Sequence, residues 1–352
     1  MIMDNVYSSE KEEVEYMYMS PSDVYLLAKH GENEKFWGPR WSPDGKYIAF
    51  VKNKLVKEDK GDIVSTISTI CIVDIKTKKI RQLTEGPDDS LPQWTHDGRI
   101  MYLERKSHIK STIKCIDKNG QDKETILEEE SLHTFSLSPD NKKILLIYSG
   151  SPSKDINNHN LVEILNLISR KRMRLVVPFT TVRTMVYSAS WHPNSEEIAY
   201  IRQCGFPAVP NDFPSFNPNN PAFFNRLFIF DLKTRKNKEI IYDSLYSAIN
   251  DLSWSPDSKW IAYCKYCRRM SFKFKREKIM DTSELCTSEL WVVNLHSGYN
   301  FYLISSTFNP KSPEETLLTD ISWSPDSKKI AFISGSDIYI GSVTVKSSPE
   351  VH

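Results

Sequence analysis

Short apolar runs recur six times along the chain, and each follows a polar phrase of similar sequence. Such runs, bounded by Ser, Pro, Asp and Gly, are typical of strands. The runs cover residues 47–50, 100–103, 144–147, 198–201, 261–263 and 330–333. The phrases cover residues 41–45, 94–98, 137–141, 191–195, 254–258 and 323–327, and three of them read Trp-Ser-Pro-Asp followed by Gly or Ser. A phrase repeated at intervals of about 40 to 70 residues indicates a repeat fold whose units pack against one another.

The phrase itself predicts a turn. Pro43 suits the second position of a type I turn, with Ser42 before it and Gly45 after it. An acidic side chain in the turn can hydrogen-bond to the neighbouring backbone and stiffen it. An active site needs unlike groups that converge, whereas a repeated turn spreads like groups around a ring. We therefore interpret the repeated aspartates as structural: Asp44, Asp97, Asp140, Asp257 and Asp326.

A tryptophan opens five of the six phrases. A large, rigid aromatic side chain buries much apolar area at once. We expect these residues to lie between neighbouring sheets, in the core: Trp41, Trp94, Trp191, Trp254 and Trp323.

Two further apolar segments follow the run in most units. In the first unit, residues 70–73 and 80–83 flank the turn 74–77, and in the second unit the corresponding turn contains Asn119-Gly120, a strong hairpin signal. Four antiparallel strands in each of six units predict an all-β fold, a six-bladed β-propeller.

The last unit lacks a fourth strand in the sequence, and an open ring would expose strand edges. We expect the N-terminal segment, residues 1–36, to supply the closing strand or a short helix. Residues 15–20 and 23–28 are the two candidates for the strand, although Ser20-Pro21 also suits a helix start. The propeller is expected over residues 37–343, followed by a polar tail over residues 344–352.

Composition excludes several classes of protein. The chain of 352 residues is 39% hydrophobic and 26% charged, with a net charge of +1, so bulk electrostatics favour neither nucleic acid nor a membrane surface. No apolar run is long enough to span a bilayer. Residues 1–15 lack the basic and apolar regions of a secretory signal. We expect a cytoplasmic protein.

No catalytic or metal-binding motif stands out. Cys264 and Cys267 have the spacing of metal ligands, but no second Cys-x-x-Cys or His pair accompanies them. The sequence has no Gly-x-Ser-x-Gly elbow, His-Glu-x-x-His pair or phosphate-binding Gly-Lys-Ser/Thr loop. We expect no cofactor, no metal and no catalytic residue among these patterns.

Long connections between the second and third strands predict one functional face. They cover residues 52–68, 149–160, 202–226 and 265–289, and all leave the same side of a propeller. Long loops on a rigid scaffold are where binding usually resides. One loop is rich in Phe and Pro and is either a flap packed over the face or a partner contact; another interleaves basic and aromatic residues, which is typical of a solvated surface or of anion binding. The candidate binding residues are Phe206, Phe213, Phe216, Phe223, Phe224, Arg268, Arg269, Lys273, Lys275 and Arg276.

The phrase Trp-Ser-Pro-Asp-Gly/Ser, followed by Lys-x-Ile-Ala-Phe/Tyr, resembles the repeat of TolB-type propellers over residues 37–343. It is also similar to the repeat in the propeller domains of prolyl oligopeptidase-type enzymes, including acylaminoacyl peptidases. Those peptidases carry a hydrolase domain after the propeller, and we expect none here. The resemblance implies a lone propeller whose relatives bind proteins or gate substrates.

The sequence favours a non-catalytic scaffold that binds a protein or peptide through its long-loop face. Two alternatives remain: a propeller-based lyase or hydrolase with its site at the channel mouth, and an accessory propeller that gates a separate peptidase. Nucleic acid is an unlikely partner, because a solvated surface accounts better for the basic loop.

Overall fold

Each polar phrase forms a hydrogen-bonded turn between two strands. In the first, Ser42 Oγ donates to Asp44 Oδ1 at 2.6 Å and accepts from the Tyr47 backbone N–H at 2.9 Å. The same aspartate oxygen accepts from the Lys46 N–H at 3.1 Å. The Ser–Asp hydrogen bond recurs at Ser138–Asp140, Ser255–Asp257 and Ser324–Asp326. These turns set the entry of each apolar run into its sheet.

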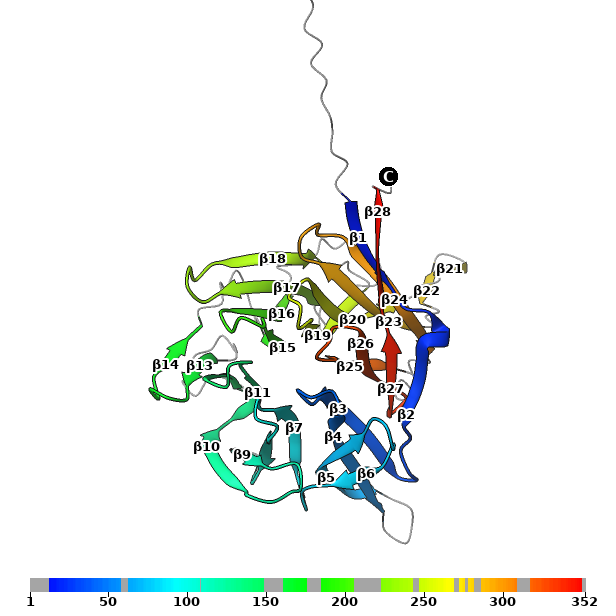
Figure 1. Ribbon diagram of the computed structural model, residues 1–352. Helices are drawn as coiled ribbons and strands as arrows, with labels where there is room; N and C mark the ends of the chain where they lie inside the picture. Colours follow the sequence, from blue (N-terminus) through cyan, green and yellow to red (C-terminus); the bar gives the residue numbers. More distant parts are fainter. Residues whose placement is uncertain are drawn as a thin grey trace, which may run out of the picture.

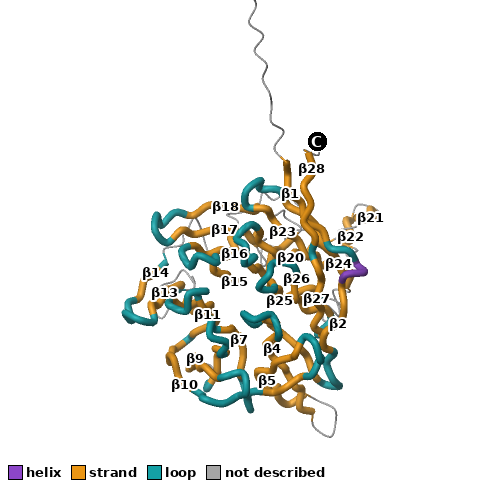
Figure 2. The backbone as a smooth tube through the Cα atoms, in the orientation of Figure 1, coloured by secondary structure: helices purple, strands orange, loops and turns teal. Residues whose placement is uncertain are grey.

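A computed structural model shows six four-stranded antiparallel sheets arranged in a ring (Figure 1). It describes residues 13–57, 63–107, 109–148, 161–175, 185–205, 223–242, 247–268, 272–275, 278–281, 286–308 and 317–349. The described part of the chain is almost entirely strand, with one short 3-10 helix, η1 (Pro21–Asp23), drawn in purple in Figure 2. The predicted all-β, six-bladed propeller is confirmed.

The blades follow one another along the chain. Blade 1 contains β3 (Glu34–Trp41), β4 (Tyr47–Lys57), β5 (Ile63–Asp74) and β6 (Ile80–Gln82). Blade 2 contains β7 (Asp89–Trp94), β8 (Ile100–Arg105), β9 (Lys110–Ile116) and β10 (Glu124–Glu130). Blade 3 contains β11 (Leu132–Leu137), β12 (Lys143–Tyr148), β13 (Val162–Asn166) and β14 (Arg172–Arg174).

Blade 4 contains β15 (Met185–Trp191), β16 (Glu197–Gly205), β17 (Phe223–Asp231) and β18 (Asn237–Tyr242). Blade 5 contains β19 (Ser247–Trp254), β20 (Trp260–Arg268), β23 (Cys286–Asn294) and β24 (Asn300–Phe308), and a hairpin of β21 (Phe272–Lys275) and β22 (Lys278–Asp281) lies between its second and third strands. Blade 6 contains β25 (Leu318–Trp323), β26 (Lys329–Ser334) and β27 (Asp337–Ser342).

The fourth strand of blade 6 comes from the beginning of the chain. Strand β2 (Val24–Ala28) pairs antiparallel with β27, from Val24 opposite Gly341 to Ala28 opposite Ile338. Just after β2, His30 Nδ1 lies 2.6 Å from Oδ1 of Asp337, the first residue of β27. The predicted closure of the ring by an N-terminal strand is confirmed, and the second of the two candidate segments provides it.

The first candidate segment forms a separate ribbon. Strand β1 (Glu13–Tyr18) pairs antiparallel with β28 (Thr344–Pro349), which lies within the expected polar tail. Met17 and Met19, which are 2% and 6% exposed, pack with Trp260 and Trp323 in a core cluster of blades 5 and 6. The two chain ends therefore leave the ring side by side, as Figure 1 shows.

The repeated tryptophans join adjacent blades. Trp94 Nε1 donates to the Arg40 carbonyl at 2.9 Å, from blade 2 to blade 1. In the same way, Trp191 Nε1 donates to the Ser136 carbonyl at 2.9 Å. Trp323 Nε1 donates to the Ser253 carbonyl at 3.1 Å. Each acceptor lies on the first strand of the preceding blade, so the indole ring fills the space between two sheets and hydrogen-bonds across it. Trp41, Trp191, Trp254 and Trp323 are buried and Trp94 is half-buried.

No helix among the described residues is long and apolar enough to cross a membrane.

Candidate binding site in an axial funnel

A cavity of about 530 Å³ opens at one end of the propeller axis. All six blades contribute to its lining, chiefly through their first strands. Asn53 lies just past the middle of β4, Ser68 just before the middle of β5, and Tyr266 near the end of β20. The cavity is therefore on the face from which the connections between second and third strands leave. We call it the axial funnel.

Bulges in the first strands shape the funnel. The pairing of the first and second strands shifts register at one place in every blade, for example between Trp37 and Arg40 and between Thr319 and Ser322. In blades 6, 1 and 2 two residues of the first strand stand opposite one residue of the second, and Asp320, Gly38 and Leu91 have positive φ angles of 52°, 57° and 54°. A bulge changes the direction of the side chains beside it and is common near functional sites.

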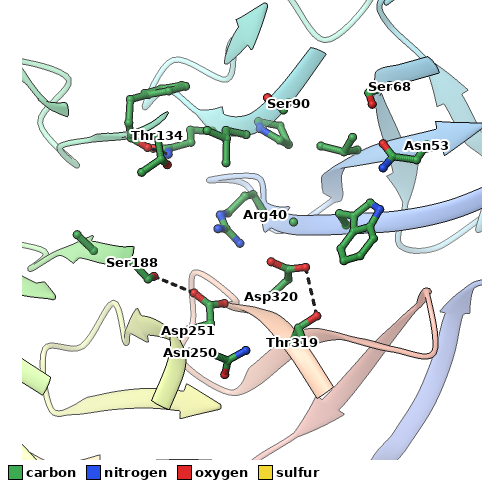
Figure 3. A pocket seen from close by; sticks show the side chains of 18 of the residues that line it. Arg40, Asn53, Ser68, Ser90, Thr134, Ser188, Asn250, Asp251, Thr319 and Asp320 are labelled. Carbon is green, nitrogen blue, oxygen red and sulfur yellow. Dashed lines mark hydrogen bonds between the residues drawn. The ribbon is translucent and has the colours of Figure 1, made fainter. Parts of the chain in front are cut away.

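Three ionisable residues line the funnel: Arg40 from β3, Asp251 from β19 and Asp320 from β25. Figure 3 shows their side chains directed toward the same space. Arg40 lies one position before the tryptophan of its own blade, and Asp251 and Asp320 lie three positions before theirs.

Asp251 links three blades. Its carboxylate accepts hydrogen bonds from Ser188 Oγ of blade 4 at 3.0 Å and from the Ile321 N–H of blade 6 at 2.8 Å. Burial raises the pKa of Asp251 to about 6; Arg40 opposes this rise, and the negative charge of Asp320 adds to it. Asp251 thus acts both as a connection between blades and as a carboxylate that titrates near neutral pH.

Arg40 and Asp320 make fewer side-chain hydrogen bonds than Asp251. Arg40 donates to the carbonyls of Pro39 at 2.9 Å and Ile321 at 3.5 Å. Asp320 accepts one recorded hydrogen bond, from Thr319 Oγ1 at 3.3 Å. Within the described part of the chain, no ion pair at 4.0 Å or less joins Arg40 to either carboxylate. Both groups therefore keep hydrogen-bonding capacity for a ligand.

An apolar wall faces these charges. Leu91, Pro92 and Leu317 line the funnel, and so does Trp37, whose residue surface is 37% exposed. Gln93 also lines it, but its amide is engaged: it donates to the Phe135 carbonyl and accepts from the Leu137 N–H, each at 2.7 Å. The funnel thus combines a charged side with an exposed aromatic surface.

A second cavity, of about 620 Å³, lies on the side of the turn phrases. It is lined by prolines of these phrases, including Pro43 and Pro256, and by Arg40, which also lines the axial funnel. Arg40 therefore stands between the two cavities along the axis.

Half of the binding residues expected from the sequence lie outside the described residues. Phe206, Phe213, Phe216, Arg269 and Arg276 belong to undescribed segments, so their role stays a prediction. Phe223 and Phe224 begin β17, Arg268 ends β20, and Lys273 and Lys275 belong to β21; their backbone is described, but their side chains are not.

One expected loop is mostly strand. Residues 52–68 were predicted to form a long connection, but β4 continues to Lys57 and β5 begins at Ile63, paired through Val56 opposite Ser65. The reason is the run of β-branched residues from Ile63 to Ile70, because Ile, Val and Thr favour strands.

Cys264, of the Cys-x-x-Cys pair, is a free, buried cysteine in β20. No group of three or more His, Cys, Asp or Glu side chains that could hold a metal ion occurs among the residues that the structure describes.

We expect the ionisation of Asp251 to make the folded protein less stable as the pH rises. The folded protein holds the Asp251 proton up to a pKa of about 6, whereas the ordinary value is 3.8. The folded state thus binds more protons between these values, so this group makes the free energy of unfolding fall as pH rises from about 4 to 6. Asp251→Asn removes this dependence, and relative to the wild type it should gain about 1 to 3 kcal/mol between pH 4 and pH 7.5.

Urea unfolding at several pH values measures this difference. Asp326→Asn is the matched control, because hydrogen bonds from Ser324 and Lys328 outweigh partial burial and lower the pKa of Asp326. The effect of Asp326 lies mainly below about pH 4, so the difference between this variant and the wild type should change little, and in the opposite direction, between pH 4 and 7.5. An Asp251→Asn difference that stays constant from pH 4 to 7.5 would contradict the assignment.

No protein-family model matches the sequence, and neither does any curated protein. Solved structures share the fold. A putative TolB from Agrobacterium tumefaciens is 12% identical, with 96% of this chain and 98% of that chain covered and a TM-score of 0.54. An oligogalacturonate lyase from Vibrio parahaemolyticus is 12% identical, with 94% and 97% covered and a TM-score of 0.52. Another oligogalacturonate lyase, in complex with manganese, is 13% identical, with 94% and 96% covered and a TM-score of 0.50.

At these identities the likeness concerns the fold alone. The protein is a six-bladed propeller similar to TolB-like propellers, as the repeated phrase indicated.

Proposed function

We propose that this propeller is a non-catalytic binding module in the cytoplasm that engages a protein or peptide through its long-loop face, with the axial funnel at the centre of the contact. The observation that supports the proposal most is the funnel itself. It combines unneutralised charged groups with an exposed tryptophan on the face that carries the long connections. Concave sites with an apolar wall and a few polar groups are typical binding sites.

A lyase with its site at the channel mouth is the second candidate, because two of the similar folds are oligogalacturonate lyases. An oligogalacturonate is a polyanion. In this funnel two carboxylates stand against one guanidinium. Like charges repel most strongly where water is partly excluded, so the lining disfavours that substrate. This electrostatic argument favours the binding module over a lyase of this type.

Affinity purification from the native host tests the proposal. The protein is compared with a variant in which short Gly-Ser linkers replace residues 206–222 and 269–285, between strands of blades 4 and 5. We expect the intact protein to enrich a defined partner at least tenfold over the deletion variant. A Lys76→Ala/Lys233→Ala variant, changed at exposed hairpin turns on the other face, is the control and should capture the partner like the wild type.

Equal capture by the deletion variant would contradict the proposed face. Turnover of oligogalacturonate, followed by the absorbance of the unsaturated product, would favour the lyase. A hydrolase as the captured partner would identify the propeller as an accessory of a separate peptidase.

A further inference from the structure

The charges of the ionised groups in the funnel do not cancel. Its charged lining residues are Arg40, Asp251 and Asp320, two carboxylates and one guanidinium. Asp251 directs its oxygens to Ser188 and to the backbone of Leu252 and Ile321. Among the residues that the structure describes, the Asp320 carboxylate accepts a single hydrogen bond, from Thr319 Oγ1 at 3.3 Å. The carboxylate with spare acceptor capacity is therefore that of Asp320.

An aromatic surface borders the same cavity. Trp37 is one of the few large hydrophobic residues of the described chain that are more than a third exposed. Leu91, Pro92 and Leu317 extend the apolar lining beside it. Tryptophan attracts a cation placed over its ring, and it also packs against an aliphatic chain. A ligand group with an apolar stem and a cationic end matches both parts of the lining.

The position of Arg40 disfavours an anionic ligand. Arg40 also lines the cavity on the opposite side, so it stands at the inner end of the funnel. Its guanidinium is turned toward the carbonyls of Pro39 and Ile321. An anion that entered from the long-loop face would meet the two carboxylates along with Arg40, and it would be repelled by them.

We propose that a lysine or arginine side chain of the partner enters the axial funnel, with its cationic end at Asp320 and its aliphatic stem against Trp37 and Leu91. The inference rests on the proposed function and adds the chemistry of the recognised residue. The cavity of about 530 Å³ is large enough for one such side chain together with part of its backbone. Charge-assisted hydrogen bonds to a partly desolvated carboxylate make the contact selective for a cation.

Binding of short peptides tests the inference directly. The probes are acetyl-Gly-Gly-X-Gly-Gly-amide peptides in which X is lysine, norleucine or glutamate, and dissociation constants are measured by saturation-transfer NMR titration. Norleucine has the straight aliphatic stem of lysine without the charge. We expect the lysine peptide to bind at least tenfold more tightly than the norleucine peptide, and the glutamate peptide to bind most weakly. Added salt should weaken the lysine peptide alone.

Variants of the full chain locate the contact. Asp320→Asn should abolish the preference for lysine over norleucine, and asparagine tolerates the positive φ of this position, so the fold is kept. Glu32→Gln, the same change at an exposed site outside the funnel, should leave the preference unchanged. Trp37→Ala should weaken the lysine and norleucine peptides alike.

Equal affinities of the lysine and norleucine peptides, tighter binding of the glutamate peptide, or no binding of the lysine peptide up to millimolar concentration would each overturn the inference. None of these results would contradict the proposed function. That function fails only if the deletion variant captures the partner as well as the intact protein does.

Discussion

Leu27→Asp is expected to open the ring and lower the free energy of unfolding by more than about 4 kcal/mol. Leu27 is 3% exposed and packs with Phe36, Ile338 and Ile340 in a core cluster of blades 6 and 1. A carboxylate at this position would be buried without a partner, which is among the most costly changes that a core can undergo. Without β2, strand β27 would become an unpaired edge, and exposed edges promote aggregation. Urea unfolding and size-exclusion chromatography measure both effects.

Tyr25→Asp provides the matched control. Tyr25 lies on the same strand, but it is 36% exposed, and its ring is near Lys78 Nζ, 5.7 Å from the ring centroid. The same new charge should therefore change the free energy of unfolding by no more than about 1 kcal/mol. If Leu27→Asp and Tyr25→Asp unfold at the same urea concentration, the closing strand is not needed for stability.

Trp323→Ala should have the second largest effect. Trp323 is 5% exposed, contributes to the cluster with Met17 and Trp260, and donates its indole N–H to the Ser253 carbonyl at 3.1 Å. Removing a buried tryptophan side chain costs about 3 to 5 kcal/mol, because apolar contacts are lost and a cavity remains. Thermal and urea unfolding of the variant measure this cost.

Trp323→Phe separates packing from hydrogen bonding. Phenylalanine keeps much of the apolar contact but leaves the Ser253 carbonyl without its donor, so we expect a loss of about 1 to 3 kcal/mol. Trp94→Ala, at a half-buried position of the same kind, should cost less than Trp323→Ala. Equal losses in Trp323→Ala and Trp323→Phe would show that the hydrogen bond, rather than the wedge between blades, stabilises the interface.

The repeating part of the fold could be predicted because its signals are local. Pro43 and Asp44 specify a turn within five residues, and the apolar run that follows specifies a strand. Closure by an N-terminal strand followed from counting strands in the last blade. The choice between the two N-terminal segments could not be made from local pattern, because both carry apolar residues and both pair with strands near the C-terminus.

The site was less accessible to sequence reasoning. Arg40, Asp251 and Asp320 are far apart in sequence and meet only after six blades have closed around an axis. One-residue bulges near Arg40 and Asp320 also shift the alternation of the strand, which a pattern of period two does not reveal. A usable signal was present nonetheless: a polar or charged residue directly precedes each repeated tryptophan, and Asp251 and Asp320 lie three positions before theirs.

The pairing of β2 with β27 has a consequence for synthesis on the ribosome. Val24 emerges before blades 1 to 5 and finds its partner Gly341 only after all five of them have been translated. Five blades can assemble in order as they emerge, while β2 waits for blade 6. Contacts between such distant residues form slowly, so nascent chains that stall before residue 337 should keep an unpaired strand and depend on chaperones until β27 has been made.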